Sequence, residues 1–595
     1  MTRAPVGVLL GVVALAVLLS GSASAADSEG AKLTAFFKAF LEEEFQHRPL
    51  DATRLGDHRF DDRLDDLSPA ARAADLARWR AALADLPKKI DVEKLSRSGR
   101  LDFEILRHDL TRSVWLAENT HPFEEDPRAF NDYITDSVYA LLTQSTLPKE
   151  KNVRNAVARM AFIPKVVAVA KATLHDTPHV TTETAVRQNR GAITFYKTGF
   201  FTLAGEEGRS AEAHMAAAKV VESLEDYQKF LEDELLPKAK GEWRLGKEKF
   251  ARKLELELDA GLTADDVLHE AEVEFERVQR DMYVIARQLW AEASKDKNGV
   301  AAPLPPDDAD GRRETIRLVL AHFNKEHGKP EELVRDARAT VDHIKTFIAD
   351  NDILRLPEPD RCQVIEMPEF QRGNAGAYLN QAPALDPKGA SFYAVSPPPR
   401  DWDDRRVNSY LEEYNKYMIQ ILTIHEAYPG HYVQLEYSNR CPSLIRRVLF
   451  SGVFAEGWAV YTEQMMLDQG YGKGDPVLRL NQLKWYLRTV ANAVLDHHMH
   501  CDHMTDEEAI ELLTKQAFQS EGEALAKVVR AKQSSCQLST YFVGRTAFYR
   551  LRQQVEREQG AAFDLGRFHE AVLDNGTLPV KYLPELVRER LSKPR

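Results

Sequence analysis

The sequence predicts a mainly α-helical protein with one short β region just before a candidate metal-binding segment. Over most of the 595-residue chain, apolar residues recur at spacings of three and four with charged residues between them, as in amphipathic helices. Two segments, 361–370 and 390–399, are instead rich in β-prone residues and bounded by proline and glycine. The segment HEAYPGHYVQ, residues 425–434, follows them and begins with adjacent histidine and glutamate.

The first 25 residues predict a signal peptide. Arg3 gives a positively charged start, GVLLGVVALAVLL is an apolar stretch that is short for a membrane span, and Ala23-Ser24-Ala25 fits a cleavage site. We therefore expect cleavage after Ala25 and a periplasmic or secreted protein that has no membrane span after cleavage. No cysteine directly follows the apolar stretch, so a lipid anchor is not indicated.

Composition limits the classes of partner. Hydrophobic residues make up 44% of the chain and charged residues 29%, which is typical of a soluble globular protein. The formal net charge is −13, and no run of basic residues stands out from the acidic residues around it. Nucleic-acid binding needs clustered Lys and Arg, so we expect no nucleic-acid partner. The sequence does not set the oligomeric state.

The helical pattern continues in order along the chain. Helices are predicted over residues 31–50, 69–86, 91–118, 150–176, 209–235, 245–259, 264–295, 311–326, 331–349, 404–425, 450–469, 476–499, 505–517, 520–533 and 537–557. The segment KNGVAAPLPPDDA, residues 297–309, is rich in proline, glycine and aspartate and predicts a long surface loop. It separates a helical N-terminal region, 26–296, from a region at 310–595 that carries the candidate site.

The β-prone segments predict a hairpin or a small sheet. Residues 361–370 and 390–399 would form its strands, and residues 371–389 would form the loop between them. The alternative is an extended loop that takes part in no sheet.

The spacing of the two histidines requires a deformed helix. His431 follows His425 by six residues, and an α-helix turns by about 100° per residue, so a regular helix would point the two side chains about 120° apart. Pro429 cannot donate a backbone hydrogen bond, and Gly430 can adopt conformations that other residues avoid. A widened or broken turn would return His431 towards His425. Alternatively, the helix simply ends at Tyr428, with His425 in the core and His431 as a cap.

A second helix, SGVFAEGWAVYTEQ at 451–464, supplies the carboxylate that a metal site needs. Glu456 lies 25 residues after His431 among apolar residues, where a carboxylate is costly unless it is paired or bound to a metal. Two histidines and one glutamate, with water as the fourth ligand, form a catalytic zinc shell. Glu463 is seven residues after Glu456, on nearly the same face, and could orient a ligand histidine. The alternative is a surface glutamate or an ion pair at Glu456.

Further polar residues are candidates for substrate contact. The segment VLDHHMHCDH, residues 494–503, holds four histidines, one of which could enter a cleft. Arg530, Tyr541, Arg545 and Tyr549 are candidate donors to a carboxylate or an oxyanion. An ordinary packing or surface role is the alternative for each of them.

Four cysteines, at 362, 441, 501 and 536, allow three complete pairings in an oxidising compartment. We favour a Cys501–Cys536 disulfide, because these two lie near the ends of two successive predicted helices. Free buried thiols are the alternative.

Several motifs together resemble a known family. HEAYPGHYVQ and EGWAVYTE resemble the bacterial domain-of-unknown-function family 885, as do LDATRLGDHRFDDRLDDLS near the N-terminus and STYFVGRTAFYRLR near the C-terminus. The resemblance covers almost the whole chain after the signal peptide. That family is placed among gluzincin-type metallopeptidases. More distantly, EGW and YFVG (541–544) resemble segments of the thimet oligopeptidase and neurolysin family, which implies a helical fold with a deep channel and a small sheet beside the metal. Residues 26–296 would form one wall of that channel.

The resemblance assigns roles to individual residues. It implies one zinc ion per chain, held by His425, His431 and Glu456, with Glu426 as the general base. His500 would contact the substrate or the transition state, and Tyr541 would donate to the oxyanion. The Pro-Gly insertion departs from ordinary gluzincins and bears on whether His431 is the second ligand.

These observations predict an exported zinc metallopeptidase that hydrolyses short peptides, as an oligopeptidase or a carboxypeptidase. Arg530 or Arg545 could hold the C-terminal carboxylate of a substrate. The segment 390–397 could pair with an extended peptide at the sheet edge. The alternatives are a metallohydrolase acting on non-peptide amides or esters, a non-catalytic zinc- or peptide-binding protein with a degenerate site, and a structural helical protein without metal.

Overall fold

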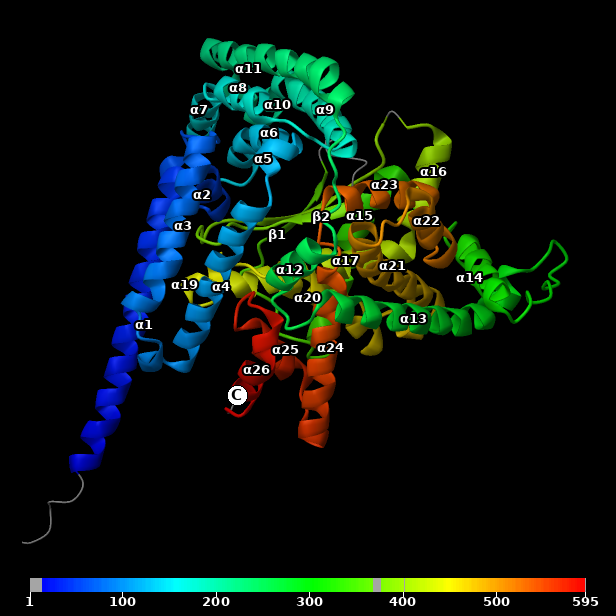
Figure 1. Cartoon of the computed structure of the whole chain (residues 1–595). Coiled ribbons are helices and arrows are strands. Elements are labelled where there is room, and N and C mark those ends of the chain that lie inside the picture. The colour runs from blue at the N-terminus through cyan, green and yellow to red at the C-terminus, as the bar shows by residue number, and fades with distance from the viewer. Residues whose placement is uncertain (1–12, 368–375, 401, 594–595) are drawn as a thin grey trace, which may run out of the picture.

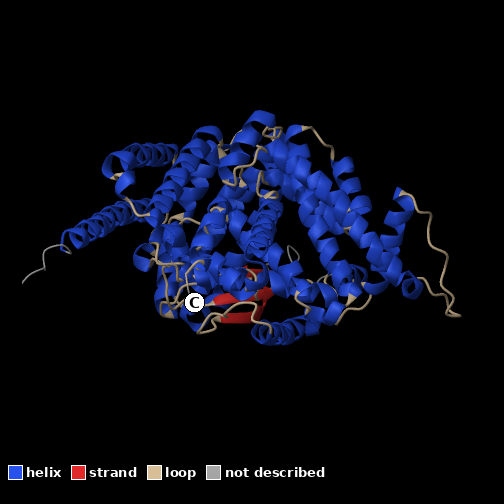
Figure 2. Cartoon of the chain, turned by 90° about the horizontal axis from the view of Figure 1, so that it is seen from below, coloured by secondary structure: helices blue, strands red, loops and turns tan. Residues whose placement is uncertain are grey.

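The fold is described from a computed structural model, which places residues 13–367, 376–400 and 402–593, with side chains from residue 28 onward. The predicted mainly α-helical class is confirmed: helices surround one small sheet (Figures 1 and 2). The predicted signal peptide, 1–25, lies outside the residues whose side chains are described. None of the helices searched in the described part combines the length and the hydrophobicity needed to cross a membrane.

In the described N-terminal half, residues 13–350, the regular elements are helices, apart from one isolated β-bridge between Lys295 and Ala301. Most of these helices begin at a serine, threonine, aspartate or proline that favours a helix start. Its α-helices are α1 (Val13–His47), α2 (Pro49–Leu55), α3 (Pro69–Lys89), α4 (Arg97–Asn119), α5 (Pro122–Glu125), α6 (Arg128–Thr143), α7 (Lys149–Met160), α8 (Ile163–Thr173), α9 (His179–Thr194), α10 (Phe200–Ala204), α11 (Ala211–Lys229), α12 (Lys247–Leu258), α13 (Ala264–Ala293), α14 (Ala309–Phe323) and α15 (Leu333–Asp350).

The C-terminal half contains the sheet and the remaining helices. The strands are β1 (Cys362–Glu366), β2 (Ala377–Asn380) and β3 (Ser391–Val395). The helices are α16 (Asp404–Glu413), α17 (Lys416–Glu426), α18 (His431–Asn439), α19 (Leu444–Val448), α20 (Gly452–Asp468), α21 (Pro476–Cys501), α22 (Asp506–Glu511), α23 (Glu521–Gln533), α24 (Thr540–Gln559), α25 (Leu565–Leu573) and α26 (Leu583–Leu591).

The small sheet has three strands in the order β1-β3-β2. β3 pairs with β1 in parallel and with β2 antiparallel. Two details of the sequence-based prediction are therefore wrong. The segment predicted as a loop contains β2, and β3 is the central strand, so its edges are already occupied and it cannot add a substrate peptide. Helix α15 packs on β1, and α17 packs on β2.

Two predicted helices are each divided in two. The helix predicted at 150–176 is interrupted between α7 and α8, where Pro164 lies in the first turn of α8. The helix predicted at 404–425 ends at Glu413 and restarts at Lys416, because the Asn415 side chain caps the new helix by accepting from the backbone N–H groups of Tyr417 and Met418. In both places a capping residue or a proline overrides a continuous apolar stripe.

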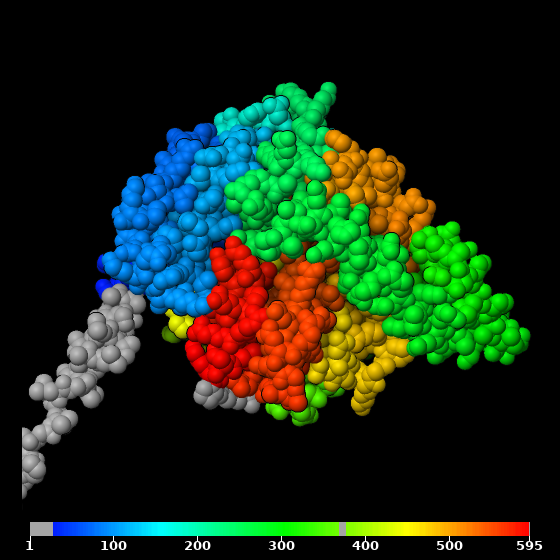
Figure 3. All heavy atoms as spheres, turned by 60° about the horizontal axis from the view of Figure 1, so that its bottom comes forward, coloured from blue at the N-terminus to red at the C-terminus, as the bar shows by residue number. Residues whose placement is uncertain are grey.

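The hydrophobic residues form two cores. A smaller core lies among α6 to α11, most of which are at the top of Figure 1. The larger core joins residues of α1, α3, α4, α12 and α13 to those of the C-terminal helices. Figure 3 shows the α4, α12 and C-terminal segments side by side on one face of the molecule. The N-terminal region thus helps to build the surroundings of the candidate site.

All four cysteines are free thiols in this structure. The favoured Cys501–Cys536 disulfide is therefore wrong. The alternative of free buried thiols holds for two of the four cysteines, since Cys362 and Cys501 are only half-buried. Cys441 and Cys536 are buried, where a thiol packs as a small apolar side chain.

Candidate metal centre

The HEAYPGHYVQ segment forms a widened turn between two helices. Helix α17 ends at Glu426 and α18 begins at His431. The N–H of Gly430 donates to the carbonyl of Ile424, six residues earlier, at 3.0 Å. A regular helix uses the carbonyl four residues earlier, so the turn contains two extra residues. A Cβ at Gly430 would lie 1.9 Å from the carbonyl oxygen of His425. Only glycine therefore fits this position.

The widened turn brings the two histidines together with Glu456. The His425 and His431 rings are 4.8 Å apart between centroids and nearly perpendicular. Glu456 Oε2 lies 3.8 Å from His425 Nε2 and 3.5 Å from His431 Nε2. One potential ligand atom from each of the three residues lies within 4.8 Å of the others. We call these three residues the ligand triad.

The ligand triad fits a zinc ion. Zinc bonds to imidazole nitrogen or carboxylate oxygen are about 2.0–2.2 Å long, and tetrahedral geometry then sets ligand atoms roughly 3.4 Å apart. The two distances to Glu456 differ from this value by only a few tenths of an ångström. The donor set of two imidazoles and one carboxylate suits zinc, although such a set also accepts other divalent ions.

Glu463 orients His425. His425 Nδ1 and Glu463 Oε1 are 2.7 Å apart, and both side chains are buried. A proton on Nδ1 directed at Glu463 leaves the Nε2 lone pair facing the triad. Burial raises the pKa of the Glu463 carboxyl well above its usual range, so its carboxylate form gains from a cation bound nearby. Glu463 therefore lies where the sequence predicted an orienting partner.

Replacing Glu463 with alanine should lower zinc affinity about 10- to 100-fold, the usual cost of losing the partner behind a ligand histidine. Glu463→Gln is the matched control, because its amide oxygen can still accept from Nδ1 and should lose less. Zinc titration against a competing chelator measures both variants. Wild-type affinity in Glu463→Ala would contradict the orienting role.

Helix α20 is held in position by Trp458 and Gly457. The Trp458 indole N–H donates to the Pro429 carbonyl at 2.8 Å, which ties α20 to the widened turn. A Cβ at Gly457 would lie 2.3 Å from Gly544 Cα on α24, so two glycines allow the helices to cross at close range. A structural role for Gly457, Trp458 and Gly544 was not predicted from the sequence, although the glycine and tryptophan directly after Glu456 were the available signal.

Glu426 lies beside the triad at the end of α17. Its Oε2 accepts a hydrogen bond from the Leu379 N–H of β2 at 3.0 Å. Burial raises the pKa of Glu426 to about 7, and Glu456 adds to this rise while His431 and the Leu379 hydrogen bond oppose it. A carboxyl with a pKa near 7 is matched to accepting and returning a proton.

The two histidines differ in their electrostatic surroundings. Burial, followed by the charge of His431, lowers the pKa of His425 to about 3. Although burial opposes it, the hydrogen bond with Glu456 raises the pKa of His431. A neutral His425 is the form that can bind a metal through its lone pair.

Tyr541 and Arg530 lie next to the ligand triad. The Tyr541 hydroxyl lies 3.2 Å from Arg530 Nη2 and 3.2 Å from Gln537 Nε2. Burial, followed by the charge of Glu456, raises the pKa of Tyr541. The close crossing of α20 and α24 at Gly457 and Gly544 places Tyr541 near Glu456. Tyr541 is one turn before Gly544, and Glu456 directly precedes Gly457.

Three predicted site residues have other partners. His500 is only 2% exposed, and its Nε2 lies within hydrogen-bond distance of the carbonyls of Ala531 and Ser534. Arg545 is bonded to Glu274 and Gln464, and its guanidinium lies between the rings of Tyr486 and Tyr549. The structure therefore does not bring His500 or Arg545 to the triad, because core contacts use their polar groups. Tyr549 does not reach the triad either: its ring packs against Arg545, and its buried hydroxyl has no hydrogen-bond partner among the described residues.

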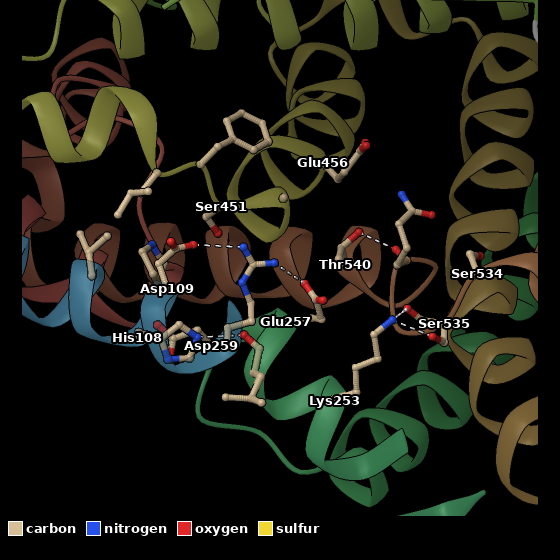
Figure 4. A pocket seen from close by; sticks show the side chains of 18 residues that line it. His108, Asp109, Lys253, Glu257, Asp259, Ser451, Glu456, Ser534, Ser535 and Thr540 are labelled. Carbon is tan, nitrogen blue, oxygen red and sulfur yellow. Dashed lines mark hydrogen bonds and ion pairs between the residues drawn. The ribbon is translucent and has the colours of Figure 1, made fainter. Parts of the chain in front are cut away.

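A charged cavity of about 440 Å³ reaches the site at Glu456. Figure 4 shows Glu456 at one edge, with its carboxylate directed away from Lys253 and Asp259. The cavity therefore lies beside the triad and does not enclose it. Its lining includes Ile105, His108, Asp109, Arg112, Lys253, Leu256, Glu257, Asp259, Ser451, Glu456, Ser534, Ser535, Gln537 and Thr540.

Comparison with known proteins gives a family and a fold. A family described as "Bacterial protein of unknown function (DUF885)" matches residues 49–587. A solved structure described as a "putative lipoprotein of unknown function" from Shewanella oneidensis is 31% identical, with a TM-score of 0.79, over 93% of this chain and 99% of that one. A "putative lipoprotein" from Colwellia psychrerythraea, 18% identical, shares the fold with a TM-score of 0.73 over 95% of this chain and 99% of that one. No curated protein matches this chain.

Proposed function

We propose that this chain, which belongs to the bacterial family DUF885, is an exported zinc-dependent metallopeptidase that hydrolyses short peptides. One observation carries the proposal. The ligand triad gathers two imidazoles and a carboxylate, and Glu426 directly follows the first of these ligands beside the same cluster. A protein that only holds zinc has no need of that extra carboxyl. The gluzincin-like part of the sequence resemblance supports the same reaction class.

The side chains divide the work of peptide hydrolysis. When bound, zinc supplies a Lewis acid that polarises a carbonyl and lowers the pKa of water. Glu426 accepts the proton of the attacking water and passes it to the leaving amine. Its hydrogen bond to Leu379 holds the carboxyl in place, and Glu463 fixes the orientation of His425.

Tyr541 is the group that stabilises the developing oxyanion in this proposal. Its hydroxyl is anchored by Arg530 and Gln537 and lies next to Glu456. A donor that is already held in position needs little reorganisation as charge develops on the substrate oxygen.

Export is proposed from the N-terminus and from the relatives. The sequence carries the predicted signal peptide over residues 1–25, and the two solved relatives are described as putative lipoproteins. Both observations support function outside the cytoplasm, in the periplasm or in the medium.

The first test is turnover of a mixed peptide library by purified residues 26–595, followed by mass spectrometry. We expect cleavage that stops after a zinc chelator removes the metal and returns when zinc is added. A heat-denatured sample treated in the same way is only a partial control, because heat also inactivates contaminating peptidases. Glu426→Gln purified in parallel is therefore the stricter control. Zinc binding without cleavage of any library peptide would contradict the peptidase proposal.

A further inference from the structure

The mechanism above uses Arg530 only as an anchor of the Tyr541 hydroxyl and makes no use of two further cationic side chains near the ligand triad. These three side chains are called the cationic cluster below. They are Arg488 on α21 and Lys527 and Arg530 on α23. Helices α21 and α23 pack together. Lys527 and Arg530 are three residues apart and so lie on neighbouring positions of one helical face. The cluster stands out in a chain whose net charge is −13.

Lys527 is buried without a counter-charge in contact. Its side chain is 4% exposed, and within the described part of the chain no hydrogen bond or ion pair joins its ammonium group to another residue. Burial, together with Arg488 and Arg530, lowers the pKa of Lys527 well below its usual range. A buried cation without a partner is costly, so this position favours the arrival of an anion.

The other two members also have spare donor groups. Arg488 Nη2 lies 3.2 Å from Glu523, but its Nη1 is buried and has no hydrogen-bond partner among the described residues. Arg530 is exposed and donates to neutral oxygens on Gln537 and Tyr541. Glu523 is thus the one carboxylate among described residues in ion-pair contact with the cluster, which retains an excess of positive charge.

The cluster borders the candidate catalytic groups. Arg530 donates a hydrogen bond to the Tyr541 hydroxyl, which is the proposed oxyanion donor. The guanidinium of Arg488 lies 4.5 Å from the ring centre of Trp485, and Trp485 is a neighbour of Glu463 behind His425. Arg488 and Arg530 also act electrostatically on His425 and Glu456, respectively.

We propose that the cationic cluster binds the C-terminal carboxylate of the peptide substrate, so that the protein removes residues from the C-terminal end. The proposal rests on the function proposed above and narrows it from short peptides in general to carboxypeptidase action. A guanidinium is suited to paired hydrogen bonds with a carboxylate. Arg530 contacts the Tyr541 hydroxyl, Arg488 interacts electrostatically with Tyr541, and Lys527 interacts electrostatically with both arginines. Arg545, the other arginine considered from the sequence, is already bonded to Glu274 and Gln464.

Binding is tested separately from turnover in the full-length, zinc-loaded Glu426→Gln protein. The probes are N-acetylated tripeptides ending in Ala, Lys or Phe, each prepared as the free acid and as the C-terminal amide. Calorimetry should show the acids binding about 10- to 100-fold more tightly than the amides, as expected for hydrogen bonds to a charged group. Adding Lys527→Met or Arg530→Gln should remove most of this preference. Adding Lys515→Met, at an exposed lysine on another helix, should leave it unchanged.

The outcomes separate this proposal from the general function. Equal binding of acids and amides would overturn the carboxylate site. Cleavage of acids and amides alike at internal bonds would also overturn it, while leaving the peptidase function standing. A preference for acids in a wild-type protein that cleaves no peptide would support the cationic cluster and contradict the peptidase function. Because Lys527→Met removes a buried charge, its thermal midpoint of unfolding should be no lower than that of the parent protein. If Lys527→Met fails to fold, the exposed Arg530→Gln variant tests the same loss of preference for acids.

Discussion

Glu426→Gln should lower kcat for peptide hydrolysis about 10²- to 10⁴-fold, the usual contribution of a general base, while zinc content stays at the wild-type level. The amide keeps the shape of the carboxyl and can still accept the hydrogen bond from Leu379. It cannot take a proton from water. Steady-state kinetics on the best library peptide, together with metal analysis of the same samples, measures both quantities.

Glu412→Gln is a matched control, because that exposed glutamate on α16 lies outside the ligand triad and its surroundings. It should retain wild-type kcat. A Glu426→Gln enzyme with unchanged kcat would show that another group accepts the proton. If Glu426→Gln loses zinc as well as activity, Glu426 acts as a ligand and the assignment of base is wrong.

His431→Ala should weaken zinc binding by more than the 10- to 100-fold expected for Glu463→Ala. It removes a ligand itself, whereas Glu463→Ala removes only the hydrogen-bond partner of the ligand His425. Bound zinc stabilises the native state by about 4 kcal/mol when its concentration is about a thousand times Kd. Added zinc should therefore raise the unfolding temperature of the wild type, but not that of His431→Ala at the same concentration. Differential scanning calorimetry with and without zinc makes this comparison.

His503→Ala is the matched control for this substitution. His503 is exposed in the histidine-rich segment after α21, so its loss should change neither zinc affinity nor the shift in unfolding temperature. Zinc affinity that survives in His431→Ala but falls in His503→Ala would place the second ligand in the 497–503 segment and refute the widened-turn site.

The residues of the ligand triad could be predicted from the sequence because their placement follows from local chemistry. Pro429 and Gly430 limit the backbone so strongly that a widened turn was an available prediction, and the Gly430 hydrogen bond to Ile424 shows how that turn is built. Glu456 and Glu463 share a helical face, which a spacing of seven predicts. The sequence did not show where these two glutamates meet the histidines. Their position depends on the packing of α20 against α24 at Gly457 and Gly544.

Residues that depend on long-range packing could not be assigned in this way. His500, Arg545 and Tyr549 have the right chemistry for a site, but the polar groups of His500 and Arg545 are used by partners far away in the sequence. The Tyr549 ring packs against Arg545, one helical turn before it. Lys527 was missed for the opposite reason. A lysine between the buried residues Ala524 and Val528 was the available signal, but only the fold shows that no carboxylate among the described residues reaches it.

The same distinction between local pattern and long-range packing explains which elements of the fold could be predicted. Long helices such as α13 and α21 were predicted within two residues at each end because their apolar residues recur at helical spacing. Strand β2 was missed because a strand of four residues carries too little periodicity, and its existence depends on pairing with β3. Helices α6 and α9 were also missed, because their β-branched residues weaken the helical signal.

The most direct test of the account is elemental analysis of purified residues 26–595 after exposure to zinc and removal of the excess. We expect about one zinc ion per chain, held by His425, His431 and Glu456 and absent from the alanine variants of these three residues. A wild-type protein that retains no metal after zinc has been supplied would contradict it, and HEAYPGHYVQ would then be a junction between two helices.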